Sequence, residues 1–201
     1  MNADMSYCGR TDRIVSNADL ERELASVRVL FCDVEGCLTD GTKWYSEKED
    51  IFIPFNSRDG LGLWLLEQFG VRVFFVTASI EKSIARKAHD MEISGCLYCK
   101  NSKMDEILKL CKRNQWNLNE CCAVGDDWWD IEMLQECGLG VCPSDAAPAA
   151  IEVADLVTNS EGGKGAVREL ADKILSAKGI ETVSVLQALR NEHVVDNSLL
   201  T

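Results

Sequence analysis

The sequence predicts an α/β fold built on a doubly wound parallel sheet. Two observations carry this prediction: strand-like and helix-like segments alternate along the chain, and the strand-like segments are short and apolar. With 201 residues the chain suits one domain with a full core. No repeat or linker marks a second domain, so we expect one domain at 27–178, after a lead-in at 1–26 and before a tail at 179–201.

The expected strands begin with the apolar run at 27–34. After it, 43–46 and 50–55 flank a polar Glu-Lys-Glu segment, and this pattern predicts a β-hairpin. The later apolar runs predict five further strands, at 71–76, 95–98, 121–124, 138–142 and 155–157.

Helix-like segments separate these strands. The segment at 59–69 is rich in large apolar residues and is closed by Gly70, as expected of a buried helix. The tail from 180 onward is expected to be partly helical. The other predicted helices lie at 80–91, 103–114, 128–137, 147–153 and 167–177.

Composition excludes several classes of partner. A formal net charge of −12 argues against nucleic acid and anionic membranes, because neither is attracted to an acidic surface. No apolar run approaches the roughly 20 residues needed to span a bilayer, and the first residues lack the layout of a signal peptide. The ten cysteines are then expected to be reduced thiols of a cytoplasmic protein. Cys96 and Cys99 have the spacing of a zinc half-site, but no second pair follows, so we do not expect zinc.

Polar residues follow four of the predicted strands where each strand ends. Asp33 and Glu35 stand two residues apart, so in an extended strand they point the same way, about 6.6 Å apart. Thr77 follows the next core strand, Lys103 opens the helix after the third, and Asp126 follows the fourth. The carboxyl ends of parallel strands form one edge of a sheet, where ligands bind. Each residue alone has an ordinary structural explanation, but their coincidence favours a reactive site.

These residue types suit phosphoryl transfer, which depends on positioning and on neutralising phosphate oxygens. Asp33, Asp126 and a backbone carbonyl offer the oxygen ligands that Mg²⁺ prefers. Thr77 can donate a hydrogen bond to a phosphate oxygen and Lys103 supplies a positive charge. Asp33 can then attack phosphorus to form an aspartyl-phosphate.

The order of these motifs resembles that of the haloacid dehalogenase superfamily of phosphohydrolases. The chain carries Asp-Val-Glu-Gly-Cys-Leu-Thr-Asp-Gly at 33–41, then the strand-end threonine, Ser-Lys, and Gly-Asp-Asp-Trp-Trp-Asp at 125–130. The hairpin and the segments at 55–60 and 162–169 resemble the branch typified by 3-deoxy-D-manno-octulosonate 8-phosphate phosphatases. That branch has no cap domain. The resemblance implies a homotetramer in which hairpins and tails of neighbouring subunits close each site.

The resemblance also implies a role for each residue at the sheet edge. Asp33 would be the nucleophile and a metal ligand, while Glu35 would act as general acid and base and give its carbonyl oxygen to Mg²⁺. Thr77 and Lys103 would bind the phosphate, and Asp126 would complete the metal site. The implied substrate is a phosphorylated octulosonic or nonulosonic acid.

Other residues would support this site. Asp127 and Asp130 are expected to support the metal. Arg58, Lys164 and Arg168 are candidates for binding the substrate's carboxylate, although ordinary surface charge explains them equally well.

Two adjacent tryptophans follow Asp127. Trp128 and Trp129 are expected to pack in the core or at an interface, and a place in the wall of the site stays open.

Glu35 departs from the family pattern, which has Asp at this position. The extra methylene moves the carboxyl by about 1.5 Å. Because Glu is a carboxylic acid of similar pKa and enolase-phosphatases carry Asp-Ile-Glu-Gly here, we expect an active enzyme with altered substrate geometry.

Two rival functions share parts of this pattern. A catalytically silent oligomerisation domain, related to the C-terminal domain of vertebrate CMP-sialic acid synthetases, has the same architecture. Such domains usually lose the nucleophile or the later acids, whereas Asp33, Thr77, Lys103 and Asp126 are present here. A phospho-accepting receiver domain places its acidic pair before the acceptor aspartate, and the order here is different.

Overall fold

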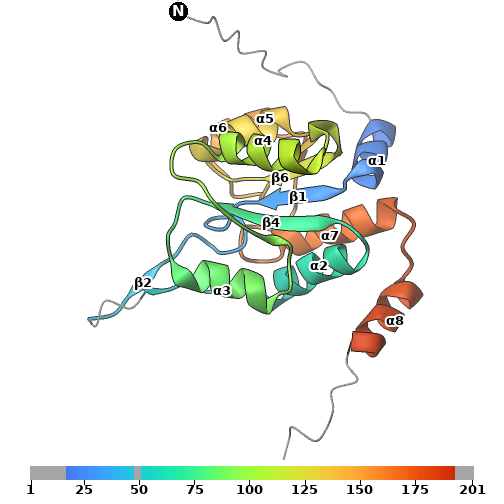
Figure 1. Cartoon of the computed structure of the whole chain (residues 1–201), viewed down its shortest axis with the longest axis horizontal. Helices are drawn as coiled ribbons and strands as arrows, with labels where there is room; N and C mark the ends of the chain where they lie inside the picture. The colour runs from blue at the N-terminus through green and yellow to red at the C-terminus, as the bar shows by residue number, and fades with distance from the viewer. Residues whose placement is uncertain (1–16, 48–50, 193–201) are drawn as a thin grey trace, which may run out of the picture.

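The computed structural model describes residues 17–47 and 51–192 and confirms the predicted α/β fold. Six strands form one sheet in the order β5-β4-β1-β6-β7-β8, and every neighbouring pair is parallel (Figure 1). The strands are β1 (Val29–Cys32), β4 (Arg72–Thr77), β5 (Gly95–Tyr98), β6 (Cys121–Val124), β7 (Leu139–Cys142) and β8 (Leu156–Val157). The chain builds outward from β1 to β5 and then crosses to β6. The strand order therefore reverses between β1 and β6, where sheets of this kind bind ligands.

Helices cover both faces of the sheet. Figure 1 shows α4, α5 and α6 on one face and α2, α3 and α7 on the other. The helices are α1 (Asn17–Ser26), α2 (Ser57–Gln68), α3 (Lys82–Asp90), α4 (Lys103–Asn114), α5 (Ile131–Glu136), α6 (Pro148–Val153), α7 (Ala166–Ala177) and α8 (Thr182–Glu192). Two 3₁₀ turns, η1 (Leu118–Glu120) and η2 (Trp128–Asp130), flank β6.

Side chains of the central strand alternate between two buried cores. Leu30 and Cys32 of β1 belong to the core under α2 and α7, while Val29 and Phe31 belong to the core under α4 and α5. Successive side chains of a strand point to opposite faces of the sheet, and helices cover both faces here. Every side chain of β1 is therefore buried, which explains why this strand has no polar residue.

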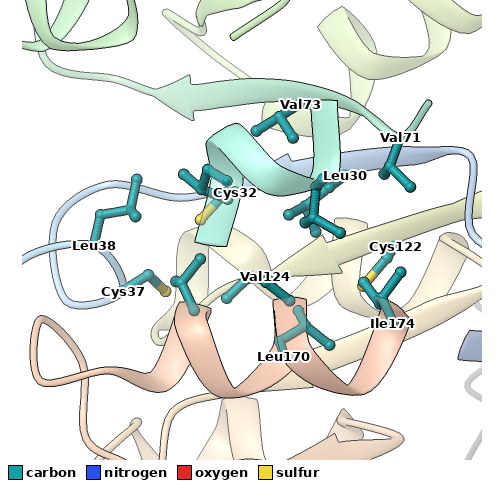
Figure 2. Packing of buried hydrophobic residues seen from close by; sticks show 14 of the residues in the cluster. Leu30, Cys32, Cys37, Leu38, Val71, Val73, Cys122, Val124, Leu170 and Ile174 are labelled. Atoms are coloured by element: carbon teal, nitrogen blue, oxygen red, sulfur yellow. The ribbon is translucent and has the colours of Figure 1, made fainter. Parts of the chain in front are cut away.

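The turn that follows β1 is anchored in one of these cores. Figure 2 shows Cys37 and Leu38 in the same cluster as Leu170 of α7, and both turn residues are at most 1% exposed. The backbone N–H groups of Leu38 and Thr39 both donate to the Val34 carbonyl oxygen at 3.0 Å. The turn is therefore held by packing as well as by hydrogen bonds.

Helices are present on both sides of the segment 27–178 that the sequence predicts as the domain. The segment predicted as a lead-in contains α1, whose Leu24 is buried in the core that α7 lines. The predicted strand at 27–34 is shortened to β1 because the chain turns after Asp33. In the tail, α8 confirms the expected helix. The rest of the lead-in, 1–16, and of the tail, 193–201, lies outside the described residues, as does 48–50 of the hairpin.

The predicted hairpin is present as β2 (Trp44–Tyr45) and β3 (Ile51–Phe52), which pair antiparallel. It projects from the body of the domain (Figure 1), and Trp44, Tyr45 and Phe52 are all more than half exposed. The nine cysteines in the described ranges are all free thiols. No described helix has the length and apolar character needed to cross a membrane.

Candidate active site

Asp33 is the first residue beyond β1, at the carboxyl edge of the sheet. Its N–H donates to the Val124 carbonyl at 2.9 Å, so the last ladder bond to β6 fixes its position. The side chain is almost fully buried. Gly36, three residues on, has a φ of +90°, and a Cβ there would lie 2.0 Å from Asp126 Oδ2. Only glycine allows the turn to bring the ends of β1 and β6 this close.

A lysine links this aspartate to the loop after β6. Lys103 begins α4, whose N-terminus is capped by Ser102, and its side chain turns inward until only 8% is exposed. Its Nζ forms ion pairs with Asp33 Oδ1 and, at 2.6 Å, with Asp130 Oδ1. Burial alone would lower the pKa of Lys103, but the two carboxylates outweigh burial and raise it. Lys103 is therefore a permanent cation in the site.

Asp130 organises the loop after β6. Its Oδ2 accepts hydrogen bonds from the N–H groups of Asp126, at 3.0 Å, and Asp127, at 3.2 Å. Asp127 accepts from Trp128 N at 2.7 Å and completes a capping box around η2. Asp130 and Asp127 thus act on the loop backbone, and Asp130 also orients Lys103. These contacts leave the Asp126 carboxylate directed at the turn after β1.

The carboxylates gather more negative charge than one lysine offsets. Burial, followed by the charge of Asp130, raises the pKa of Asp33 well above its ordinary value, despite the opposing effect of Lys103. Burial, Asp130 and Asp127 raise the pKa of Asp126 to about 6. A further cation would relieve this repulsion, which is the electrostatic condition for a metal site.

One group of side chains in the described ranges meets the geometry of a metal site. Ligand atoms of Asp33, Cys37 and Asp126 lie within 4.8 Å of one another. Mg²⁺ prefers oxygen ligands, which the two aspartates supply. Burial raises the pKa of Cys37 well above its ordinary value, so the thiol stays protonated and is a poor ligand. The two aspartates fit Mg²⁺, and Cys96 and Cys99 are not part of this group.

Glu35 lies across the turn from Asp33 and contacts two other elements. Its Oε2 accepts a hydrogen bond from Thr77 Oγ1 at 3.1 Å, and its Oε1 lies 2.8 Å from Lys43 Nζ. Thr77 is buried, and its Oγ1 also accepts from Ser79 N at 2.9 Å. Burial would raise the pKa of Glu35, but Lys43, followed by Thr77 and Ser79, outweighs it and lowers the pKa.

Lys43 was not predicted as a site residue. In the sequence it is only the residue before an expected strand. The basic residue ten positions after the nucleophile, at the base of a hairpin, was the available signal.

The three cations predicted to bind a substrate carboxylate make no ion pair with Asp33, Asp126 or Asp130. Arg58 is exposed in the first turn of α2, and its guanidinium has no hydrogen bond or ion pair in the structure described. Lys164 pairs with Glu161. Arg168 donates from Nε to Asp172 at 2.8 Å and lines a cavity of about 700 Å³ beside α2, α7 and α8.

The loop that carries Lys164 packs tightly against the turn after β1. Gly163 N donates to the Cys37 carbonyl at 2.9 Å, and a Cβ on Gly162 would lie 1.8 Å from the Gly36 carbonyl oxygen. The glycines thus allow two backbone segments to touch. This contact places the 162–165 loop beside the site.

Trp128 and Trp129 are each 74% exposed, which excludes a place in the core. Trp129 lines a cavity of about 110 Å³ together with Lys103, Cys99 and Asn101. The structure therefore places Trp129 in the wall of a cavity that reaches Lys103.

Known proteins similar to this chain show its family. A family model described as haloacid dehalogenase-like hydrolase matches residues 97–170. The 3-deoxy-D-manno-octulosonate 8-phosphate phosphatase of Yersinia pestis is 31% identical over 160 residues, which cover 80% of this chain and 86% of that protein. The fold and the site define a haloacid dehalogenase-like hydrolase, and the chain belongs to this family.

Solved structures and further relatives place the chain more narrowly. The phosphatase of that name from Moraxella catarrhalis, in complex with magnesium ion, phosphate ion and a KDO molecule, superposes with a TM-score of 0.82 at 26% identity. The match covers 86% of this chain and 99% of that one. Danio rerio N-acylneuraminate cytidylyltransferase B is 29% identical over 78% of this chain but only 38% of that enzyme. The chain is a phosphatase that resembles the octulosonate 8-phosphate phosphatases.

Proposed function

We propose that this protein is a Mg²⁺-dependent phosphomonoesterase that acts on a phosphorylated 2-keto-3-deoxy sugar acid. The substrate would be an octulosonate 8-phosphate or a nonulosonate 9-phosphate, and the reaction would pass through an aspartyl-phosphate. The observation that carries the proposal is the buried group of Asp33, Lys103 and Asp130 beside Asp126 at the carboxyl edge of the sheet. The similarity to octulosonate 8-phosphate phosphatases supports the substrate class.

Asp33, Asp126 and the backbone carbonyl of Glu35 would hold Mg²⁺. When bound, the ion would neutralise charge on the carboxylates and on the phosphoryl oxygens. Asp127 and Asp130 would support this set from the loop after β6, because they fix the backbone that carries Asp126.

In the first step an Asp33 carboxylate oxygen would attack phosphorus, and the bond from phosphorus to the sugar oxygen would break. Thr77 and Lys103 would bind phosphoryl oxygens, and Glu35 would act from its protonated form, giving its carboxyl proton to the departing sugar oxygen and becoming a carboxylate. In the second step Glu35 would take a proton from water, which would attack phosphorus and release Asp33 and inorganic phosphate. The substrate carboxylate would be bound by one or more of Arg58, Lys164 and Arg168. Of these, Lys164 lies in the loop that packs against the turn after β1.

The test is phosphate release from a panel of sugar-acid phosphates in the presence of Mg²⁺. Asp33→Asn should abolish release, while Asp105→Asn, on the first turn of α4, is the matched control and should keep the wild-type rate. An Asp33→Asn protein that releases phosphate at the wild-type rate would remove Asp33 as nucleophile.

The second candidate function is a catalytically silent oligomerisation domain. The similarity to part of an N-acylneuraminate cytidylyltransferase favours it. The intact set of Asp33, Thr77, Lys103 and Asp126 opposes it. No release from any substrate in the panel by a correctly assembled protein would favour the silent domain.

We also propose that the protein is a homotetramer whose hairpins and tails close neighbouring sites. The exposed Trp44, Tyr45 and Phe52 on the hairpin support this, because exposed aromatic clusters mark interaction surfaces. A mass measurement of the native assembly tests it.

A further inference from the structure

We propose that Lys43 is a positioning residue for Glu35, which holds the carboxyl of this longer side chain in place for proton transfer. The inference rests on the proposed phosphatase function. It adds a residue outside the predicted site and accounts for how a glutamate can work where an aspartate is usual.

The carboxylate of Glu35 is held from two sides by two different elements. Lys43, directly before β2, lies 2.8 Å from Oε1, and Thr77, the last residue of β4, donates to Oε2 at 3.1 Å. The hairpin base and the sheet edge thus hold one carboxylate between them.

The contact with Lys43 is partly shielded from water. The side chains of Lys43 and Glu35 are 31% and 24% exposed, whereas ion pairs that contribute little are typically between fully exposed side chains. Oε1 itself is inaccessible to solvent, and Lys43 is the cation that lies against it.

An anchor on the hairpin side matters because Glu has one more rotatable bond than Asp, and general acid–base catalysis needs the carboxyl within hydrogen-bond reach of the reacting oxygen. The Thr77 hydroxyl has one proton to donate, so it would release Oε2 when it binds a phosphoryl oxygen. Lys43 is then the anchor that remains. An Asp carboxyl, about 1.5 Å further back, would lie further from Lys43. Lys43 therefore compensates for the length of Glu35.

The experiment compares kcat/KM on two phosphate esters. A sugar-acid phosphate has a poor leaving group that needs a proton, whereas p-nitrophenyl phosphate releases a stable anion that does not. Since kcat/KM reports the steps up to departure of the leaving group, Lys43→Met should lower it about tenfold on the sugar-acid phosphate, below the typical 10²–10⁴-fold effect of losing the acid itself. On p-nitrophenyl phosphate the change should stay within about twofold, and Lys43→Arg should restore the sugar-acid rate.

A double-mutant cycle separates positioning from direct substrate binding. In a Glu35→Gln background, Lys43→Met should have an effect below about twofold, because the group it positions is gone. Lys173→Met, which removes a lysine that pairs with Glu169 on α7, is the matched control and should keep both rates. Equal losses on both esters, or a full loss that persists in the Glu35→Gln background, would overturn the role of Lys43. A wild-type protein that hydrolyses neither ester would instead refute the proposed function.

Discussion

The edge of the sheet and the hairpin differ in their exposure to water: the charged side chains at the sheet edge are buried, whereas the aromatic side chains of the hairpin are exposed. At the sheet edge, Lys103 lies among Asp33 and Asp130, all nearly inaccessible to water, and each position is fixed by a strand end or a helix start. On the hairpin, Trp44 and Phe52 face solvent, and Lys43 is the residue whose ion pair joins its base to the site. A single chain thus brings together the residues proposed for phosphoryl transfer, while the aromatic side chains of its hairpin stay exposed.

Removing Lys103 should have the largest effect, because it removes the cation of the buried ion pairs at the sheet edge. Lys103→Met leaves Asp33 and Asp130 buried without their cation, and breaking a buried pair typically costs about 3–5 kcal/mol of unfolding free energy. Phosphate release should fall by about 10²-fold or more, since a donor to the phosphoryl oxygens is lost.

Denaturant unfolding and phosphate release measure the two effects. Lys109→Met is the matched control, because that lysine is exposed on the same helix and pairs only at the surface. A Lys103→Met protein as stable as the wild type would show that the aspartates are neutral in the absence of metal.

The stability of the metal-free protein should depend on pH through the carboxyls at the buried edge of the sheet. A carboxyl whose pKa is raised in the folded chain contributes its full stability at pH values below its ordinary pKa, which is 3.8 for Asp. This contribution is lost as the pH rises through the pKa of the folded state, which is about 6 for Asp126. Asp33 shifts in the same direction. Metal-free protein should therefore be less stable at about pH 7 than at about pH 5, and Mg²⁺ should remove this difference.

Urea unfolding with EDTA or with Mg²⁺ at both pH values is the measurement. Asp126→Asn should flatten the metal-free dependence, because the titrating carboxyl is gone. Metal-free wild-type protein that gains stability between these pH values would contradict the raised pKa values.

The contrast between the two regions also explains what the sequence could predict. The strands at 95–98 and 121–124 and the helix at 103–114 have the predicted bounds, since buried apolar runs leave little freedom. Parallel topology then brings Asp33, Lys103 and the loop after β6 together without knowledge of any side-chain rotamer. Residues whose placement follows from strand ends were therefore predictable.

Placements that depend on rotamers or distant packing were not. Trp128 and Trp129 point outward because η2 directs both side chains away from the core. Arg168 turns along its own helix toward Asp172. Helix α1 depends on Leu24 meeting α7, a contact between segments some 145 residues apart that no local pattern reveals.

Replacing the exposed aromatic residues of the hairpin tests whether the hairpin forms a subunit interface. Trp44 and Phe52 pair across β2 and β3, and a Trp44→Ser, Phe52→Ser double variant should dissociate the proposed tetramer. Because both side chains are more than half exposed, stability of the subunit should change by less than about 1 kcal/mol. Phosphate release should fall about tenfold, as expected when a remote wall of a site is lost.

Native mass and phosphate release report the two outcomes for the hairpin. Leu108→Ser, an exposed apolar residue on α4, controls for a general loss of surface hydrophobicity. A double variant that keeps the wild-type mass would place the subunit interface elsewhere.

The smallest effect is expected at Trp129, an exposed residue beside the buried edge of the sheet. Trp129 is 74% exposed yet lines the cavity of about 110 Å³ that reaches Lys103. This volume is too small for a whole octulosonate, so the rest of the proposed substrate would extend past the cavity. Trp129→Ala should raise KM about threefold to tenfold with little change in kcat, as loss of ground-state binding does. Trp128→Ala is the matched control, because Trp128 is equally exposed but does not line that cavity. Equal KM changes in the two variants would contradict a specific contact between Trp129 and the substrate. The part of the substrate outside the cavity would then extend in a direction away from Trp129.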